Sequence, residues 1–152
     1  MIKHIKCDIF ESGADAILHQ VNCQGVMGSG IAKQVKEKYP WVYAHYKRFC
    51  KNFRNKEDLL GFKQGIYINE KQEIINLYSQ LNYGYDGKCY TDYDALEKAL
   101  KSVNNFYKGK TIAIPYLMGC ARGGGDWNVV YKMIEEIFDD NINILICEYD
   151  RG

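Results

Sequence analysis

The sequence predicts one α/β domain in which helices pack on a mixed β-sheet. Its 152 residues are about the size of one average domain. A hydrophobic fraction of 47% and a charged fraction of 26% are the balance of a globular chain with one sizeable core. Strand-like and helix-like segments also alternate along the chain. We therefore expect a single domain over residues 1–152, built as a mixed-sheet α/β sandwich.

Six segments have the pattern of β-strands. The first, Ile2 to Cys7, alternates weakly between apolar and polar residues. The second, Ala16 to Asn22, carries no charge and mixes β-branched with aliphatic residues, so it should be buried on both faces and central in the sheet. The others are expected at Phe62 to Asn69, Glu73 to Leu77, Thr111 to Tyr116 and Asn143 to Glu148, with the first two of these joined as a hairpin.

Four segments have the spacing of amphipathic helices. The first leaves a glycine-rich loop near Ile31 and ends before Pro40, and the second runs from Pro40 to about Lys51 with proline in its first position. The third begins at Thr91 or Asp92 and is stopped by Gly109, and the fourth spans about Trp127 to Phe138. The resulting order is β-β-α-α-β-β-α-β-α-β.

Charge and cysteine content exclude several classes of protein. Twenty basic and nineteen acidic residues leave a net charge of +1, too little for strong nucleic-acid binding, so any contact with a polyanion must be local. No segment approaches the roughly 20 apolar residues of a membrane span, and charged residues interrupt any secretory signal. We expect a cytoplasmic chain without a membrane partner. The six cysteines form no CxxC pair, which indicates reduced thiols and no metal site.

Two glycine-rich loops are the main functional signal. In each case an apolar strand runs into the loop and a helix follows it, first at Gly25 to Gly30 and again at Gly119 to Gly125. A helix start presents unpaired N–H groups and the positive end of its dipole, and glycines let the backbone approach phosphate oxygens closely. Neither loop matches a Walker or dinucleotide-binding fingerprint. Side by side, the two loops would hold the two phosphates of a diphosphate.

Four groups of residues also carry a family resemblance. They are Cys7-Asp8-Ile9, His19 to Gly25, Met27 to Ala32, and Ile114-Pro115-Tyr116 with Gly119-Cys120 and Gly124 to Trp127. Together they resemble the macrodomain family over nearly the whole chain. The resemblance is closest to the branch with the ADP-ribose 1''-phosphate phosphatases of the yeast type and their phage or bacterial relatives. It implies a three-layer α/β/α fold that binds ADP-ribose in a cleft across the strand ends.

The resemblance implies a role for each matching residue. Asp8, with Ile9 beside it, matches the acidic residue that binds the adenine amino group, and Asn22 matches the residue facing the distal ribose. Tyr149 lies where the family can place an aromatic or apolar group against adenine. The phosphate loops correspond to Gly28, Ser29, Gly30 and Ile31, and to Gly119, Cys120, Ala121, Arg122, Gly123 and Gly124. Arg122 departs from the common family pattern, and either contact with phosphate or exposure to solvent is consistent with its position.

Another branch of the family removes ADP-ribose from protein or DNA. It uses a lysine just after the fourth strand and an aspartate inside the second loop. The corresponding positions here are Ser79 or Gln80 and Gly123, so the lysine-dependent mechanism lacks its nucleophile and its partner carboxylate.

His19 and Asp126 are the catalytic candidates that the phosphatase resemblance implies. Asp126 would position or deprotonate water, and His19 would protonate the leaving oxygen or act as nucleophile. Each has a structural alternative. Asp126 stands where aspartate caps a helix. His19 shares a strand face with Val21 rather than with Asn22, so either a bulge lies near Val21 or His19 is a buried histidine held by a core hydrogen bond.

These observations give one leading hypothesis and two rivals. The leading hypothesis is a monomeric macrodomain that binds ADP-ribose and hydrolyses ADP-ribose 1''-phosphate to ADP-ribose and phosphate without a metal or other cofactor. The first rival is a non-catalytic ADP-ribose-binding module. The second is an ADP-ribosyl hydrolase that acts on modified macromolecules.

Tyr83 and Tyr85 would either line the cleft as a flap over the distal ribose or pack on the domain surface.

Overall fold

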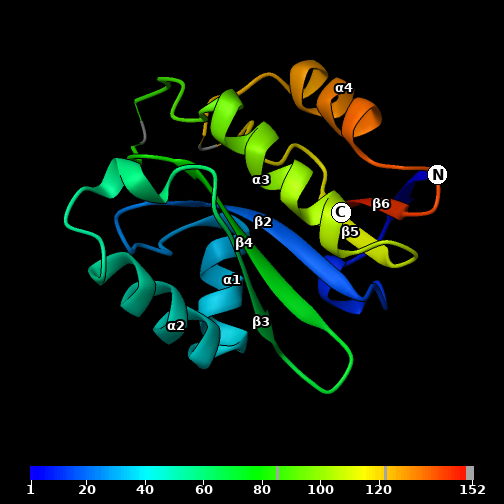
Figure 1. Ribbon diagram of the computed structural model, residues 1–152, viewed down its shortest axis with the longest axis horizontal. Helices are drawn as coiled ribbons and strands as arrows, with labels where there is room; N and C mark the ends of the chain where they lie inside the picture. The colour runs from blue at the N-terminus through cyan, green and yellow to red at the C-terminus, as the bar shows by residue number, and fades with distance from the viewer. Residues whose placement is uncertain (85, 122, 150–152) are drawn as a thin grey trace.

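The computed structural model of the chain is a six-stranded sheet between two pairs of helices (Figure 1). It describes residues 1–84, 86–121 and 123–149. The strand order is β1-β6-β5-β2-β4-β3, in which only the β3–β4 pair is antiparallel. The sheet is therefore mixed, as the sequence predicts.

The six predicted strands are all present. They are β1 (Ile2–Lys6), β2 (Ala16–Asn22), β3 (Lys63–Tyr67), β4 (Glu73–Gln80), β5 (Thr111–Pro115) and β6 (Asn143–Glu148). The central position of β2 is confirmed, because it lies between β5 and β4, and so is the hairpin of β3 and β4. The fourth strand continues to Gln80, beyond the predicted end at Leu77. The predicted end is wrong because the polar residues that follow Leu77 remain paired with β2.

The four predicted helices are also present. They are α1 (Gly30–Lys38), α2 (Pro40–Lys51), α3 (Tyr93–Phe106) and α4 (Trp127–Ile137). The carboxylates of Asp92 and Asp126 cap α3 and α4 by accepting backbone N–H bonds from the first turn. Two short 3-10 helices, Ile9–Glu11 and Lys56–Leu59, were not predicted, since three or four residues are too few to show a helical period.

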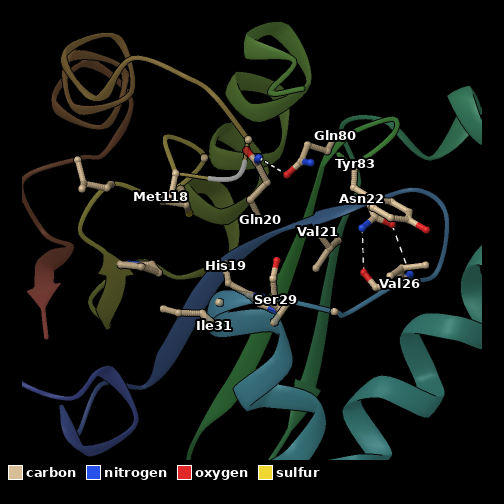
Figure 2. Close-up of a pocket in the computed structure, with 18 of the residues that line it drawn as sticks. His19, Gln20, Val21, Asn22, Val26, Ser29, Ile31, Gln80, Tyr83 and Met118 are labelled. Atoms are coloured by element: carbon tan, nitrogen blue, oxygen red, sulfur yellow. Dashed lines mark hydrogen bonds between the residues drawn. The ribbon is translucent and has the colours of Figure 1, made fainter. Parts of the chain in front are cut away.

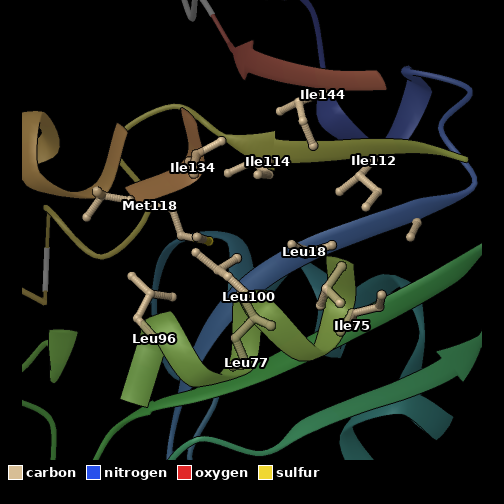
Figure 3. Close-up of a cluster of buried hydrophobic side chains, with 14 of the residues drawn as sticks. Leu18, Ile75, Leu77, Leu96, Leu100, Ile112, Ile114, Met118, Ile134 and Ile144 are labelled. Carbon is tan, nitrogen blue, oxygen red and sulfur yellow. The ribbon is translucent and has the colours of Figure 1, made fainter. Parts of the chain in front are cut away.

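Two hydrophobic clusters fill the spaces between the layers. The cluster on the α3 and α4 side includes Leu18 of β2, Leu100 of α3 and Ile134 of α4 (Figure 3). The cluster on the α1 and α2 side includes Ile17 of β2 and Tyr46 of α2. Because successive residues of β2 enter opposite clusters, this strand is buried on both faces. The three-layer α/β/α arrangement is confirmed.

Three further features bear on the expectations from composition. All six cysteines are free. Within the described residues, no three histidine, cysteine or acidic side chains are grouped closely enough to hold a metal ion. No helix in residues 1–84, 86–121 or 123–149 is long and apolar enough to cross a membrane.

Candidate functional site

The two glycine-rich loops line one pocket at the carboxyl ends of β2 and β5 (Figure 2). Its volume of about 320 Å³ is at the lower end of the range for small-molecule sites. The first loop contributes Val26 and residues 28–32, and the second contributes Gly119, Ala121 and Gly123. Residues 19–22 of β2 and residues 115–118 complete much of the wall. The structure thus brings together two segments that are about 90 residues apart in the sequence.

A second pocket of about 270 Å³ adjoins the first. Four residues line both pockets, namely Ile31, Pro115, Tyr116 and Leu117. Asp8, Ile9 and Tyr149 lie in the second pocket, so the residues that the resemblance connects with adenine are grouped at this end. Asp8 Oδ1 accepts a hydrogen bond from the backbone N–H of Phe10 at 3.0 Å, which fixes the carboxylate at the start of the first 3-10 helix.

The larger pocket has no charged side chain among its described lining residues. Any attraction of this pocket for an anion must therefore come from backbone N–H groups. Helix α1 begins in the wall at Gly30, and the side chain of its N-cap residue, Ser29, makes no capping hydrogen bond. The N–H groups of the first turn of α1 thus lack a side-chain acceptor, which is the arrangement that binds anions at helix starts.

Asn22 sets the shape of the first loop. Its Nδ2 donates to the carbonyl of Val26 at 2.8 Å, and its Oδ1 accepts from the backbone N–H of Gln24 at 2.9 Å. The buried hydroxyl of Tyr46 shares its proton between the backbone carbonyl of Asn22, at 2.6 Å, and the same Oδ1, at 2.9 Å. Asn22 is 8% exposed, and both the oxygen and the nitrogen of its side-chain amide are hydrogen-bonded. Its structural role is therefore to hold the loop against α2.

Gln20 and Thr91 hold the second loop. Gln20 Nε2 donates to Thr91 Oγ1 at 3.0 Å, and Thr91 Oγ1 donates to the carbonyl of Gly119 at 2.7 Å. The same carbonyl also accepts from the backbone N–H of Gly125 at 2.9 Å. The N–H groups of Tyr90 and Thr91 both donate to the carbonyl of Gly123. This anchor was not predicted, although a glutamine at an inward position of an apolar strand was a signal for it.

The close packing of the second loop explains its glycines. A Cβ on Gly123 would lie 2.6 Å from both the carbonyl oxygen of Gly119 and Thr91 Oγ1. A Cβ on Gly124 would lie 2.4 Å from the carbonyl oxygen of Lys88, and this glycine has a φ of +69°. Leu117 has a φ of +65°, where a Cβ is strained, and its side chain lines both pockets. Strained backbone of this kind is concentrated at ligand sites.

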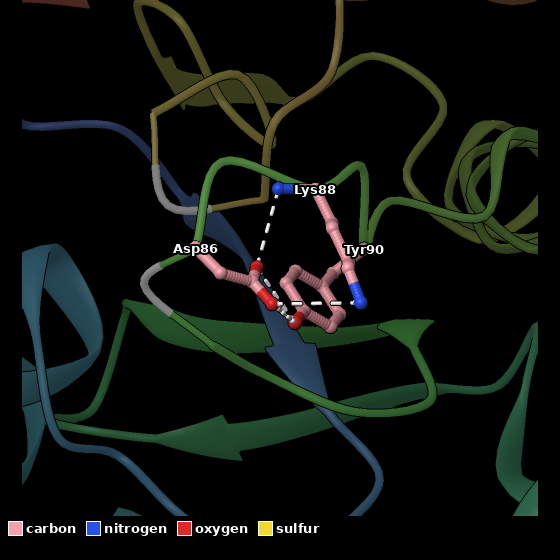
Figure 4. A network of polar contacts seen from close by, with 3 residues as sticks. All are labelled: Asp86, Lys88 and Tyr90. Carbon is pink, nitrogen blue, oxygen red and sulfur yellow. Dashed lines mark hydrogen bonds and ion pairs between the residues drawn. The ribbon is translucent and has the colours of Figure 1, made fainter.

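A segment after β4 reaches over the same pocket. Tyr83 and Gly84 line it, so Tyr83 is in the cleft wall, whereas Tyr85 lies outside the described residues. The hydroxyl of Tyr90 donates to the carboxylate of Asp86 at 2.9 Å, and Lys88 Nζ is 3.8 Å from the same carboxylate (Figure 4). The Tyr90 hydroxyl bond lowers the pKa of Asp86. These contacts lie within the segment itself, which is joined to the second loop by the backbone bonds from Tyr90 and Thr91 to the carbonyl of Gly123.

His19 is a buried, uncharged histidine. It is 2% exposed, and its Nε2 lies 2.6 Å from Asn76 Oδ1. Asn76 Nδ2 in turn donates to Gln64 Oε1, so Asn76 presents its oxygen to His19 and His19 Nε2 carries the proton. Burial lowers the pKa of His19 to about 4, although the Asn76 bond opposes this effect. The imidazole is therefore neutral at pH 7, and its Nδ1 is buried with no hydrogen-bond partner among the described residues.

Both structural alternatives for His19 are present. The core hydrogen bond is the one to Asn76. The register between β2 and β4 also shifts, because Val21 pairs with Tyr78 while Asn22 pairs with Gln80. The extra residue is Ser79 on β4, so the irregularity lies on the neighbouring strand. Both His19 and Asn22 line the larger pocket.

Three of the predicted site residues are absent from the described lining of both pockets: Cys120, Gly124 and Asp126. Asp126 is exposed, and its Oδ1 accepts from the backbone N–H of Asn128 at 2.9 Å, which confirms the helix cap. Burial raises the pKa of the Cys120 thiol to about 11, so it is protonated at neutral pH. Arg122 lies outside the described residues.

Comparison with known proteins fits this arrangement. No family model matches the chain. Among solved structures, the macrodomain of Mycobacterium tuberculosis DarG superposes with a TM-score of 0.78 and 24% identity over 100% of this chain and 99% of that one. The chain has the macrodomain fold. A protein of unknown function from Bacteroides thetaiotaomicron superposes with a TM-score of 0.85 and 25% identity, over 97% of this chain and 98% of its own.

Curated relatives of this chain fall into two groups. A DNA ADP-ribosyl glycohydrolase of Mycobacterium bovis is 27% identical over 141 residues, which cover 91% of this chain and 39% of the relative. An ADP-ribose 1''-phosphate phosphatase of Neosartorya fischeri is 47% identical over 53 residues, which cover 34% of this chain and 26% of the relative. This chain thus spans about two fifths of the length of the first relative, and its resemblance to the phosphatase branch is confirmed over a shorter stretch.

Proposed function

We propose that this macrodomain binds ADP-ribose in the cleft formed by the two adjoining pockets. The observation that carries the proposal is the convergence of both glycine-rich loops on a pocket with no charged side chain among its described lining residues. Such a pocket recognises an anion through backbone N–H groups and a helix dipole. The diphosphate would lie between the first turn of α1 and the second loop.

The two ends of the cleft give the ligand a direction. At one end the carboxylate of Asp8 is an acceptor for an amino group such as that of adenine, and Tyr149 and Ile9 supply apolar surface there. At the other end Asn22, Gln80 and Tyr83 surround the space for the distal ribose. The chemistry that bound ADP-ribose would undergo is set by this second end.

The proposed reaction is the hydrolysis of ADP-ribose 1''-phosphate to ADP-ribose and phosphate without a metal. The backbone N–H groups of the loops would stabilise the charge that develops on the phosphoryl oxygens. Because His19 is uncharged at neutral pH, we assign it the role of nucleophile: its Nδ1 would take the phosphoryl group while the ribose oxygen leaves and takes a proton from water, and a second water would then release phosphate from His19. That role requires a ring movement that exposes Nδ1. Asp126, outside the described lining, would have to reach water through a movement of the second loop.

A second candidate reaction is the release of ADP-ribose from a modified macromolecule. The alignment with a DNA ADP-ribosyl glycohydrolase over 91% of the chain favours it. The described lining of the larger pocket contains no lysine, so a lysine nucleophile would not be available. The reaction would instead use water positioned by the substrate itself. A module that binds ADP-ribose without turnover is the third possibility, and the same experiment distinguishes all three.

The test begins with calorimetry of ADP-ribose binding, with AMP as the control ligand for the adenine end alone. We expect heat from ADP-ribose that AMP does not reproduce, and no heat from either would overturn the proposal. Phosphate release from ADP-ribose 1''-phosphate is then followed for the wild type, His19→Gln, Asp126→Ala and Asp126→Ser. Serine keeps a helix cap and removes the carboxylate, so catalysis by Asp126 predicts equal loss in both variants. If Asp126 acts only as a helix cap, phosphate release should fall in Asp126→Ala and not in Asp126→Ser.

Absence of phosphate release would remove the phosphatase reaction. Release of ADP-ribose from an ADP-ribosylated oligonucleotide or protein in the same preparation would then establish the second candidate. Binding without either reaction would establish a non-catalytic module.

A further inference from the structure

A strongly basic surface lies beside the first loop. Residues 30–56 contain eight lysine and arginine residues but a single acidic residue, Glu37. The rest of the chain has twelve basic and eighteen acidic residues, so the net charge of +1 conceals a marked separation of charge. We define the basic surface by five exposed side chains on α1 and α2: Lys33, Lys36, Lys47, Arg48 and Lys51.

The charges of the basic surface are not neutralised within the described part of the protein. None of its five side chains is in an ion pair with a described residue. Lys36 of α1 and Lys47 of α2 instead converge on one aromatic ring, with their Nζ atoms 4.5 and 5.8 Å from the centre of the Tyr43 ring. Two positive charges near one ring raise the local potential of the surface, which favours the binding of an anion there.

The basic surface also adjoins the larger pocket. The hydroxyl of Tyr43 lies 3.5 Å from the carbonyl oxygen of Gly25, in the first loop. A Cβ placed on Gly25 would be 3.9 Å from Lys47 Cγ, so the side chain of Lys47 runs along the same loop. A polyanion on the basic surface would therefore pass close to the entrance of the pocket.

We propose that the basic surface binds the phosphate backbone of a polynucleotide. Several lysines and arginines spread over two neighbouring helices (Figure 1) match an extended chain of phosphates better than a single anion. An ADP-ribosyl group attached to such a strand would reach the pocket while the strand stays on α1 and α2; this last step alone rests on the proposed function.

The experiment measures the fluorescence anisotropy of a labelled single-stranded DNA of about 20 nucleotides, longer than a typical single-strand site. The wild-type protein should bind it at low salt and lose affinity linearly with the logarithm of salt concentration. Lys36→Glu/Lys47→Glu should weaken binding about tenfold or more and reduce the salt slope by about 1.4, since each phosphate contact on a single strand contributes about 0.7. Lys98→Glu/Lys132→Glu, on the exposed faces of α3 and α4, changes the net charge equally and should leave affinity within about twofold.

Three results would overturn the proposal. They are the absence of DNA binding at low salt, an equal loss of affinity in the control pair, and equally tight binding of a poly-glutamate peptide, which would indicate an acidic protein partner. Thermal unfolding of each variant checks that it folds. Neither lysine pair lines the cleft, so ADP-ribose calorimetry on the same variants separates failure of this proposal from failure of the proposed function.

Discussion

The two glycine-rich loops face the same pocket but are held in place in opposite ways. The first is held mainly by one side chain, Asn22, which bonds to three groups of the loop and of α2, while Gln24 and Tyr43 each add one side-chain bond. The second is held by several overlapping bonds, so the carbonyl of Gly119 accepts from both Thr91 and Gly125. The first loop has open space around Gly30, whereas the second has none around Gly124.

This difference predicts opposite sensitivities. The first loop should be sensitive to the loss of a side chain and tolerant of an added one. The second loop should tolerate the loss of a side chain, since its bonds are redundant, and should not accept an added Cβ. The predictions that follow test this contrast from the largest expected effect to the smallest.

The largest effect is expected from Gly124→Ala compared with Gly30→Ala. Both glycines have positive φ, so both substitutions carry backbone strain of about 1 kcal/mol. Only the Cβ at Gly124 meets backbone, 2.4 Å from the Lys88 carbonyl oxygen, so its total cost should be about 3 kcal/mol or more. Urea denaturation gives both values. Equal destabilisation by the two variants would show that crowding does not distinguish the loops.

The next effect concerns pH and the strand that leads into the first loop. The pKa of His19 is about 4 in the folded protein and about 6.5 in the unfolded chain, so the unfolded chain binds more protons between these values. Stability should therefore be complete above pH 6.5 and fall by about 3 kcal/mol as the pH drops to 4. His19→Gln should flatten this part of the denaturation profile.

His45→Gln is the matched control for the pH experiment, because His45 is exposed on α2. It should follow the wild-type profile between pH 4 and 6.5. If the wild type and His19→Gln lose the same stability between pH 6.5 and 4, the result would contradict the burial of His19 as a neutral imidazole.

A third pair compares the side chains that anchor the loops. Asn22→Ala leaves the N–H of Gln24 and the carbonyl of Val26 without their partner, and should cost about 2 to 3 kcal/mol and most of the affinity for ADP-ribose. Thr91→Val should cost about 1 kcal/mol, since Gly119 and Gln20 each keep another partner. Denaturation and calorimetry measure both quantities. A larger cost for Thr91→Val would reverse the contrast.

The smallest effect on stability is expected from Leu117→Gly. Glycine relieves the strain of a positive φ but adds entropy to the unfolded chain, so the protein should gain at most about 1 kcal/mol. Leu117 lines both pockets, so ADP-ribose affinity should fall even as stability rises. A thermal melt and a titration on one sample show whether the two quantities move in opposite directions.

Much of this architecture was predictable because it depends on local pattern. The uncharged run of Ala16 to Asn22 identified the central strand, and the glycine spacing identified both loops. Asp126 as a helix cap follows from its position before an apolar helical run. These features require only neighbours in the sequence.

The parts that were not predicted depend on contacts across the sheet. The tautomer of His19 is set by Asn76 and Gln64, on β4 and β3. The role of Gln20 depends on Thr91, which is 71 residues further along the chain. Such pairs leave no periodic pattern in the sequence. The sequence can therefore predict that each residue is polar and points inward, but not which residue it bonds to.

The additional residue at Ser79 has a geometric consequence for the cleft. It lets two successive side chains of one strand point to the same side, so that Ser79 Oγ reaches Gln20 Oε1 at 2.9 Å and Gln80 Oε1 accepts from Gln20 Nε2 at 2.6 Å. Both the oxygen and the nitrogen of the Gln20 side-chain amide are therefore hydrogen-bonded by this strand. Deleting Ser79 would restore an unbroken ladder in which Gln80 follows Tyr78 directly and takes the position of Ser79, so that one side chain instead of two would remain to hold the amide of Gln20.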